Sequence, residues 1–207
     1  MTQNLGANYS AHIDTLKARH DAALAASGFD HVAFFGGALH TIFLDDMDYP
    51  FKANPHLKYW VPVVSNPNCF LVYTPGNKPL LVFYKPVDYW YKVADAPSGY
   101  WVDHFDIRFI ANAEDAKALM PKGRAAFIGE WSPAFEAWGF AANNPSELVS
   151  RLHFDRATKT AYEIDCTRAA TTIGVRAHRA AEKAFRAGAS EFEINLEYLR
   201  STGHMEH

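Results

Sequence analysis

The chain has 207 residues, of which 49% are hydrophobic and 14% aromatic, enough apolar material for one sizeable core or two smaller ones. Lys and Arg (20) nearly balance Asp and Glu (23), and the two signs are interspersed, so the sequence offers no basic stripe to nucleic acid or to a membrane surface. With no signal-peptide pattern at the N-terminus and no apolar run near the roughly 18 residues of a membrane span, we expect a cytoplasmic globular protein.

The first part of the chain alternates between helical and strand-like patterns. Apolar positions on one face predict a helix over residues 10–27, with Gly28 as its stop. Short apolar runs bounded by turn residues predict strands, and the turn chemistry of 74–79 predicts a β-hairpin between two of them. The predicted strands are 31–35, 69–73, 80–84, 105–110 and 125–129. This alternation predicts an α/β layer structure in the first ~150 residues.

Two short helices complete this part. Residues 113–120 fit one helix, and Ser132-Pro133 opens another that ends near Gly139, in the usual order of cap and then proline.

After residues 143–148 the sequence becomes helical, and we expect a domain boundary near Thr158. Thr160 and Glu163 have capping-box spacing and precede a long amphipathic helix, which Gly188 closes. Ser190 and Glu193 repeat the capping box for a second helix. Two helices alone bury little surface, so this second unit looks unfinished.

Few residues suggest chemistry by their spacing. The closing "HMEH" at 204–207 places two histidines three apart, but a catalytic zinc site needs a third protein ligand, and a solvated chain end is the favoured interpretation. Cys69 and Cys166 are too few for a disulfide framework and are interpreted as reduced structural thiols. The sequence contains no nucleophile elbow, G-x-G-x-x-G motif or Walker loop.

The most unusual segment is residues 43–62, where Asp45, Asp46 and Asp48 stand among aromatic residues and prolines. Burying carboxylates in such surroundings costs free energy unless they are solvated or paired. The loop is therefore either exposed to solvent or presents a carboxylate to a ligand. Alternatively, Asp45 or Asp46 caps a turn. Residues 84–90 are similar, because their aromatic side chains could line a pocket or cover the sheet.

Several segments, in the same order and spacing, resemble bacterial Xaa-Pro dipeptidases of the prolidase type and the closely similar organophosphorus acid anhydrolases. The matching segments are "FLDDMDYPFKANP", "FYKPVDYW", "RATKTAYEIDCTRAA", "GVRAHRAAEKAFRAGASEFEINLEYL" and the closing "TGH". The resemblance runs from about Tyr9 to His204. It implies an α/β fold: a creatinase-like N-terminal domain with a mixed sheet and flanking helices over 1–158, followed over 159–207 by the first two helices of an incomplete pita-bread (α+β) catalytic domain.

The resemblance also implies an activity, which is the hydrolysis of Xaa-Pro dipeptides by a water that bridges two manganese ions. The family's five metal ligands are two aspartates, a histidine and two glutamates, and none of their motifs occurs in these 207 residues. We therefore expect no catalytic or metal-binding residue in this chain, both Mn ions to be bound beyond residue 207, and the chain alone to be inactive.

Two residues match family positions near the substrate. Asp46 matches an aspartate that reaches the substrate pocket of the opposite subunit in a homodimer, and Trp90 matches an aromatic residue close to that pocket. A carboxylate near a free α-amino group could select dipeptides over longer peptides. Two alternatives are a non-catalytic creatinase-like dimerisation or binding module and a relative that hydrolyses organophosphorus compounds.

Overall fold

The computed structural model describes residues 5–90 and 92–203, which divide into two compact units. One unit is Tyr9–Thr158 and holds the β-sheet; the other joins Met1–Asn8 to Lys159–His207 and is helical where it is described. The chain passes from one unit to the other between Thr158 and Lys159. That the second unit begins a pita-bread domain stays a prediction.

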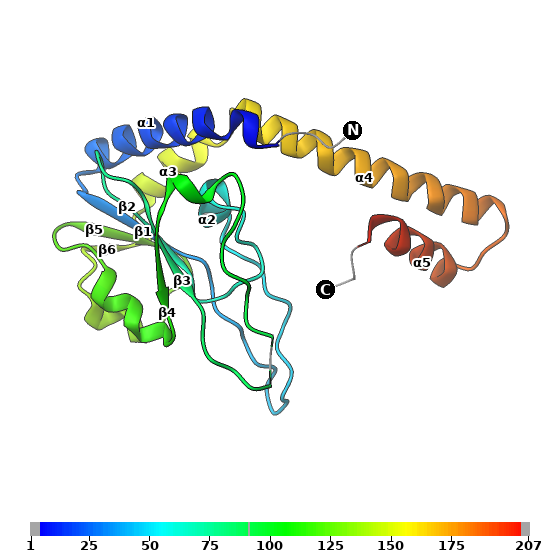
Figure 1. The fold of residues 1–207 in the computed structure, drawn as a ribbon, viewed down its shortest axis with the longest axis horizontal. Coiled ribbons are helices and arrows are strands. Elements are labelled where there is room, and N and C mark those ends of the chain that lie inside the picture. Colours follow the sequence, from blue (N-terminus) through cyan, green and yellow to red (C-terminus); the bar gives the residue numbers. More distant parts are fainter. Residues whose placement is uncertain (1–4, 91, 204–207) are drawn as a thin grey trace. The chain divides into compact units, whose positions relative to one another are not determined.

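The sheet unit contains a six-stranded mixed sheet in the order β4-β3-β2-β1-β5-β6 (Figure 1). Only β2 runs antiparallel to its neighbours, so β1, β3, β4, β5 and β6 all point the same way. All five predicted strands are confirmed, whereas β6 was not predicted because two residues show no alternation. The strands are β1 (His31–Phe35), β2 (Phe70–Tyr73), β3 (Leu80–Tyr84), β4 (Asp106–Ile110), β5 (Ala125–Ile128) and β6 (Ala142–Asn143).

Helices cover both faces of the sheet (Figure 1). Successive residues of a strand face opposite sides, and β1 shows where each side packs. Phe34 contacts rings of α1 (Tyr9–Ser27) and α2 (Pro55–Trp60), while Phe35 contacts the ring of Phe135 in a 3-10 helix. The α1 face also carries α3 (Ser146–Asp155), and the Phe35 face carries the 3-10 helices η3 (Ala113–Leu119) and η4 (Pro133–Trp138).

The short helices differ from the expectation in kind. The segments at 113–120 and after Ser132 form 3-10 rather than α-helices, although Ser132 caps the second, accepting from the Ala134 amide at 3.3 Å, and Gly139 ends it with φ +84°. Helix α2 was not predicted, because its six residues lie inside the segment interpreted as a loop. Two further 3-10 turns are η1 (Leu5–Asn8) and η2 (Val102–His104).

The helical unit is a hairpin of α4 (Ala161–Arg186) and α5 (Glu191–Thr202), and both predicted capping boxes are present. The Arg176 Nε donates to the Ser201 carbonyl oxygen at 3.0 Å across the hairpin. Phe185 and Phe192 remain about two-thirds exposed, so the described part of this unit leaves apolar surface uncovered. No helix in the described part of the chain is both long and apolar enough to cross a bilayer.

Candidate functional site

The loops that carry Asp46 and Trp90 leave the sheet at the same end. Because β2 lies between β1 and β3 and is antiparallel to both, those two strands point the same way and end at the same edge of the sheet, at Phe35 and Tyr84. In Figure 1 the two loops extend in the same direction beyond that end. The topology therefore brings the two predicted site residues to one end of the sheet. The structure gives no direct contact between them among the residues that it describes.

Asp46 lies at the tip of a small hydrogen-bonded hairpin formed by residues 40–49. The backbone amide of Tyr49 donates to the His40 carbonyl oxygen, and the amide of Ile42 donates to the Met47 carbonyl oxygen, both at 2.8 Å. Leu44 occupies the tip with φ 60°, a left-handed conformation that is unfavourable for a bulky residue. Such backbone strain persists only where the surroundings impose it, and it is commonest at functional sites.

The two neighbouring aspartates of the tip have different roles. Asp45 caps the turn, since its Oδ1 accepts from the amides of Asp46 at 2.7 Å and Met47 at 3.1 Å. The Asp46 side chain is exposed, and its carboxylate has no partner among the described residues. The capping alternative therefore applies to Asp45, and Asp46 is the carboxylate that the loop presents to solvent.

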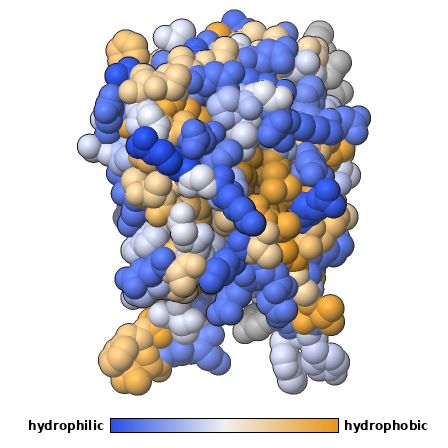
Figure 2. All heavy atoms as spheres, turned by 90° about the vertical axis from the view of Figure 1, so that its left-hand side faces the viewer, coloured by the Kyte–Doolittle hydropathy of each residue, from blue (hydrophilic) through white to orange (hydrophobic). Residues whose placement is uncertain are grey.

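Trp90 does not cover the sheet, because 84% of it is exposed. Its amide donates to Asp88 Oδ1 at 2.7 Å, and its ring meets the Tyr89 ring edge-on at 5.0 Å. Exposed apolar side chains accumulate on both loops, and Figure 2 shows hydrophobic atoms at the lower end of the molecule, towards which these loops extend in Figure 1. We define the loop patch as Leu39, Phe43, Leu44, Met47, Tyr49, Val87, Tyr89 and Trp90.

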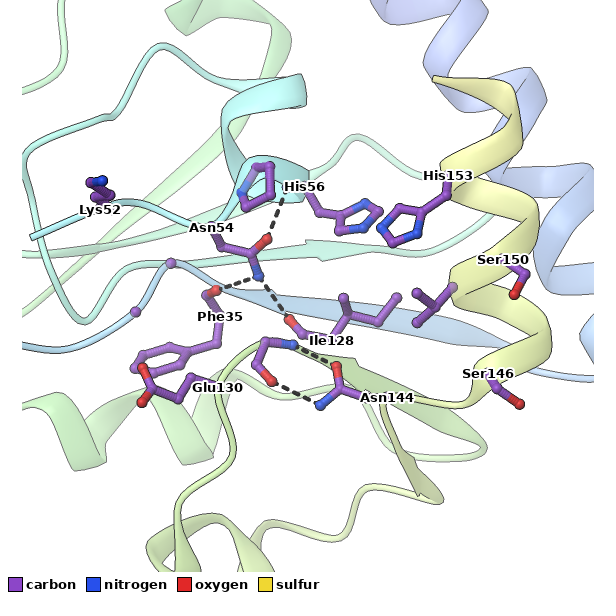
Figure 3. Close-up of a pocket in the computed structure, with 15 residues that line it drawn as sticks. Phe35, Lys52, Asn54, His56, Ile128, Glu130, Asn144, Ser146, Ser150 and His153 are labelled. Carbon is purple, nitrogen blue, oxygen red and sulfur yellow. Dashed lines mark hydrogen bonds between the residues drawn. The ribbon is translucent and has the colours of Figure 1, made fainter. Parts of the chain in front are cut away.

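Asn54 fixes the base of the first loop (Figure 3). Its Nδ2 donates to the carbonyl oxygens of Phe35 at 2.8 Å and Ile128 at 3.3 Å, which are the last residues of β1 and β5. Its Oδ1 caps α2 by accepting from the His56 amide at 2.9 Å. A single side chain thus ties together two strand ends and the helix that follows the loop.

A cavity of about 580 Å³ opens just beyond these strand ends (Figure 3). Its walls come from the turns after β1 and β5, from the start of α2 and from one side of α3. Sequence reasoning missed this cavity, since its residues are far apart in the chain and form no local motif. The polar side chains that line it belong to Lys52, Asn54, His56, Glu130, Asn144, Ser146, Ser150 and His153.

His56 is the buried polar group of this cavity, with only 4% of its surface exposed. Its ring is stacked between those of Phe34, at 5.6 Å and 11°, and His153, at 5.0 Å and 15°. Neither ring nitrogen has a hydrogen-bond partner among the described residues. Burial, reinforced by the nearby Arg156 and His153, lowers the pKa of His56 to about 3, so the ring is neutral at physiological pH.

The described residues contain no group of three or more His, Cys, Asp or Glu that could hold a metal ion. The "HMEH" segment at 204–207 lies outside them. Both cysteines are free thiols, and burial raises the pKa of Cys69 to about 11, so this thiol is poorly reactive in the folded state.

Comparison with known proteins gives a consistent family assignment. The family model for the N-terminal domain of Xaa-Pro dipeptidase matches residues 7–154. The chain is 46% identical over 200 residues to an Xaa-Pro dipeptidase of Shewanella oneidensis, covering 96% of this chain and 46% of the relative. It is 48% identical over 202 residues to that of Xanthomonas euvesicatoria, covering 97% of this chain and 45% of the relative. The chain therefore spans about half the length of the curated relatives that it matches.

Solved structures show the same fold at low sequence identity. Aminopeptidase PepP of Pseudomonas aeruginosa matches with a TM-score of 0.62 and 17% identity, over 93% of this chain and 48% of the other. Aminopeptidase P of E. coli matches with a TM-score of 0.61 and 18% identity, over 92% of this chain and 49% of the other. These likenesses agree with the expected creatinase-like fold, a mixed sheet with flanking helices. The extent of the family match and the identity to its members show that the chain belongs to the Xaa-Pro dipeptidase family and carries its N-terminal domain.

Proposed function

We propose that this chain is the N-terminal, substrate-selecting and dimer-forming part of a metal-dependent enzyme that hydrolyses Xaa-Pro dipeptides in the cytoplasm. The observation that carries the proposal is the Asp46 carboxylate, which has no partner among the described residues and stands at the tip of a hydrogen-bonded hairpin within the loop patch. The relatives at 46% and 48% identity bear the name Xaa-Pro dipeptidase.

The loop patch supports a role at an interface with a second copy of the chain. Phe43 and Leu44 are 86% and 92% exposed, an arrangement that a lone soluble domain rarely keeps without a partner. Burying them against another surface would also withdraw Asp46 from water. A desolvated carboxylate is costly unless a cation pairs with it, and the α-ammonium group of a dipeptide is such a cation.

A carboxylate in this position would distinguish dipeptides from longer peptides. Asp46 would accept hydrogen bonds from the α-ammonium group only when that group lies one residue before the scissile bond. A longer peptide has an uncharged amide at this place, which leaves the carboxylate unpaired and disfavours binding. Trp90, on the neighbouring loop, would offer a flat apolar wall to the dipeptide.

The metal centre is proposed outside the described residues, because no group of His, Cys, Asp or Glu among them fits a metal ion. Two manganese ions, as the resemblance implies, would supply the activated water. The described part of the chain is assigned binding and positioning only.

Adjacent substitutions in the polypeptide expressed from its whole coding sequence test the role of Asp46. Asp46→Asn removes the charge that would bind the α-ammonium group, and we expect KM for Leu-Pro to rise by about 10- to 100-fold. Asp45→Asn makes the same charge change one residue away and keeps an oxygen for the turn cap, so its KM should stay close to that of the unmodified enzyme. Steady-state kinetics with manganese measures both values.

Three results would contradict parts of the proposal. Equal KM values for the two variants would contradict the role of Asp46. Absence of proline release by the unmodified, manganese-loaded protein would contradict the proposed activity and favour the non-catalytic module. A monomer in sedimentation analysis at micromolar concentration would contradict the proposed dimer.

A further inference from the structure

The hairpin that presents Asp46 is held in shape by its own contacts. Besides the two backbone hydrogen bonds across it, Thr41 Oγ1 donates to Asp48 Oδ1 at 2.8 Å. Packing adds little, because from Leu39 to Pro50 every side chain is exposed except that of Ile42, which is partly buried. These contacts determine the shape of hairpin 40–49 but not its orientation relative to the sheet.

A single hydrogen bond joins this hairpin to the turn after β5. Within the described part of the chain, it is the one hydrogen bond from residues 40–49 to a residue outside the hairpin: His40 Nε2 donates to Glu130 Oε2 at 2.9 Å. His40 is also the first residue of the hairpin, and its carbonyl oxygen accepts from the Tyr49 amide at 2.8 Å. The contact with Glu130 therefore acts at the base of the hairpin, on the residue where its two arms meet.

Glu130 stands on a firmly held part of the sheet unit. The residue before it, Gly129, exchanges two hydrogen bonds with the Asn144 side chain, at 3.0 and 2.8 Å (Figure 3). The residue after it, Trp131, packs its ring edge-on against that of Phe127 in β5, with centroids 5.1 Å apart. The backbone of Glu130 is thus fixed on both sides, although its side chain extends into solvent.

The stability of the fold does not explain this contact. The side chains of His40 and Glu130 are 57% and 60% exposed, and exposed pairs of this kind contribute little to global stability. A contact between a fixed residue and the base of a hairpin instead restricts rotation of the hairpin as a whole. A small rotation at the base produces a larger displacement at the tip, where Asp46 lies.

We propose that Glu130, acting through His40, is a positioning residue that orients hairpin 40–49 and so determines where the Asp46 carboxylate stands. The inference rests on the proposed role of Asp46 in binding the α-ammonium group of a dipeptide. Glu130 itself touches no substrate in this scheme. Its loss should therefore weaken substrate binding and leave the chemical step unchanged.

Steady-state kinetics with manganese tests this role in the polypeptide expressed from its whole coding sequence. Glu130→Ala should raise KM for Leu-Pro by about two- to fivefold, the range expected for the loss of an exposed hydrogen-bonded pair, without a change in kcat. Glu130→Gln keeps an oxygen that can accept from His40 and should restore most of the affinity. Glu136→Ala, at an exposed position in η4, is the matched control and should leave KM unaltered.

Combination with Asp46→Asn shows whether Glu130 acts through Asp46. In the Asp46→Asn variant, Glu130→Ala should cause no further rise in KM, because the carboxylate that it positions is gone. Effects that multiply, or an unchanged KM in Glu130→Ala beside a raised KM in Asp46→Asn, would overturn the positioning role alone. An unchanged KM in Asp46→Asn would contradict the proposed function, and the positioning role with it.

Backbone ¹⁵N relaxation in the 207-residue chain tests the anchor without reference to activity. Glu130→Ala should lower the order parameters of the amides in hairpin 40–49 and leave those of β1 and β5 unchanged, with no measurable fall in the melting temperature. His40→Ala removes the other partner and should have the same effect. Order parameters that stay equal to those of the unmodified chain in both variants would overturn the proposal.

Discussion

Acidification should destabilise the sheet unit through two buried histidines. His20 of α1 is 1% exposed, and its Nδ1–H donates to the Leu16 carbonyl oxygen at 2.7 Å, while its Nε2 has no partner in the described part of the chain. Burial among aromatic rings lowers the pKa of His20 to about 4, and that of His56 falls to about 3. Both histidines therefore fold in the neutral form.

The sign and size of the effect follow from the difference between folded and unfolded pKa values. An unfolded histidine has a pKa near 6.5, so protons bind preferentially to the unfolded chain once the pH falls below that value. The stabilisation is complete above about pH 6.5 and is lost progressively as the pH falls towards the folded pKa values. At about pH 5, the free energy of unfolding should be lower by about 2 kcal/mol for each of His20 and His56, together about 4 kcal/mol.

Tryptophan fluorescence during urea unfolding reports this loss of stability in the sheet unit, since all five tryptophans lie within Tyr9–Thr158. His20→Phe has no titrating ring, so between about pH 7.5 and pH 5 it should lose about 2 kcal/mol instead of about 4. His178→Phe, an exposed position in the other unit, should lose as much as the unmodified chain. An equal acid-induced loss in His20→Phe and the unmodified chain would refute the role of His20.

Two further changes test other parts of the sheet unit. Asn54→Ala removes two hydrogen bonds to strand ends and the cap of α2. In urea titrations it should lower the free energy of unfolding by about 2–4 kcal/mol. A loss below about 1 kcal/mol would show that these hydrogen bonds do not stabilise the fold. Cys69, with its buried thiol and raised pKa, should react with a disulfide reagent at least about tenfold more slowly than Cys166 in the native state and equally fast in denaturant; equal native rates would contradict its burial.

The regular elements could be predicted from the sequence because each carries its own local signal. Residues 10–27 show helical periodicity, the five longer strands are short apolar runs between turn residues, and Thr160 and Ser190 begin capping boxes that the structure contains. In contrast, α2 is only six residues long and shows no period, although its cap and first residue, Asn54-Pro55, were a readable signal.

The site residues named from the sequence stay predictions, and the cavity was not predicted from the sequence, for a physical reason. Asp46 and Trp90 were identified by resemblance, and the shared direction of β1 and β3 shows why two distant loops leave the same end of the sheet. The cavity depends on the pairing of β1 with β5 and on the stacking of His56 against His153, contacts between distant segments that no local pattern reveals. Isolated histidines in a sequence give no sign of their partners.

The hydrogen bonds of Asn54 also determine how well the loop that holds Asp46 tolerates changes in its length. The backbone amide of Asn54 donates to the Gly36 carbonyl oxygen at 2.9 Å. The intervening segment 37–53 therefore leaves and rejoins the fold at nearly one point, as an Ω-loop does. The closure entropy of such a loop grows only with the logarithm of its length, and doubling the length costs about 0.6 kcal/mol. Insertions or deletions in this loop can therefore alter its reach while the sheet keeps its stability.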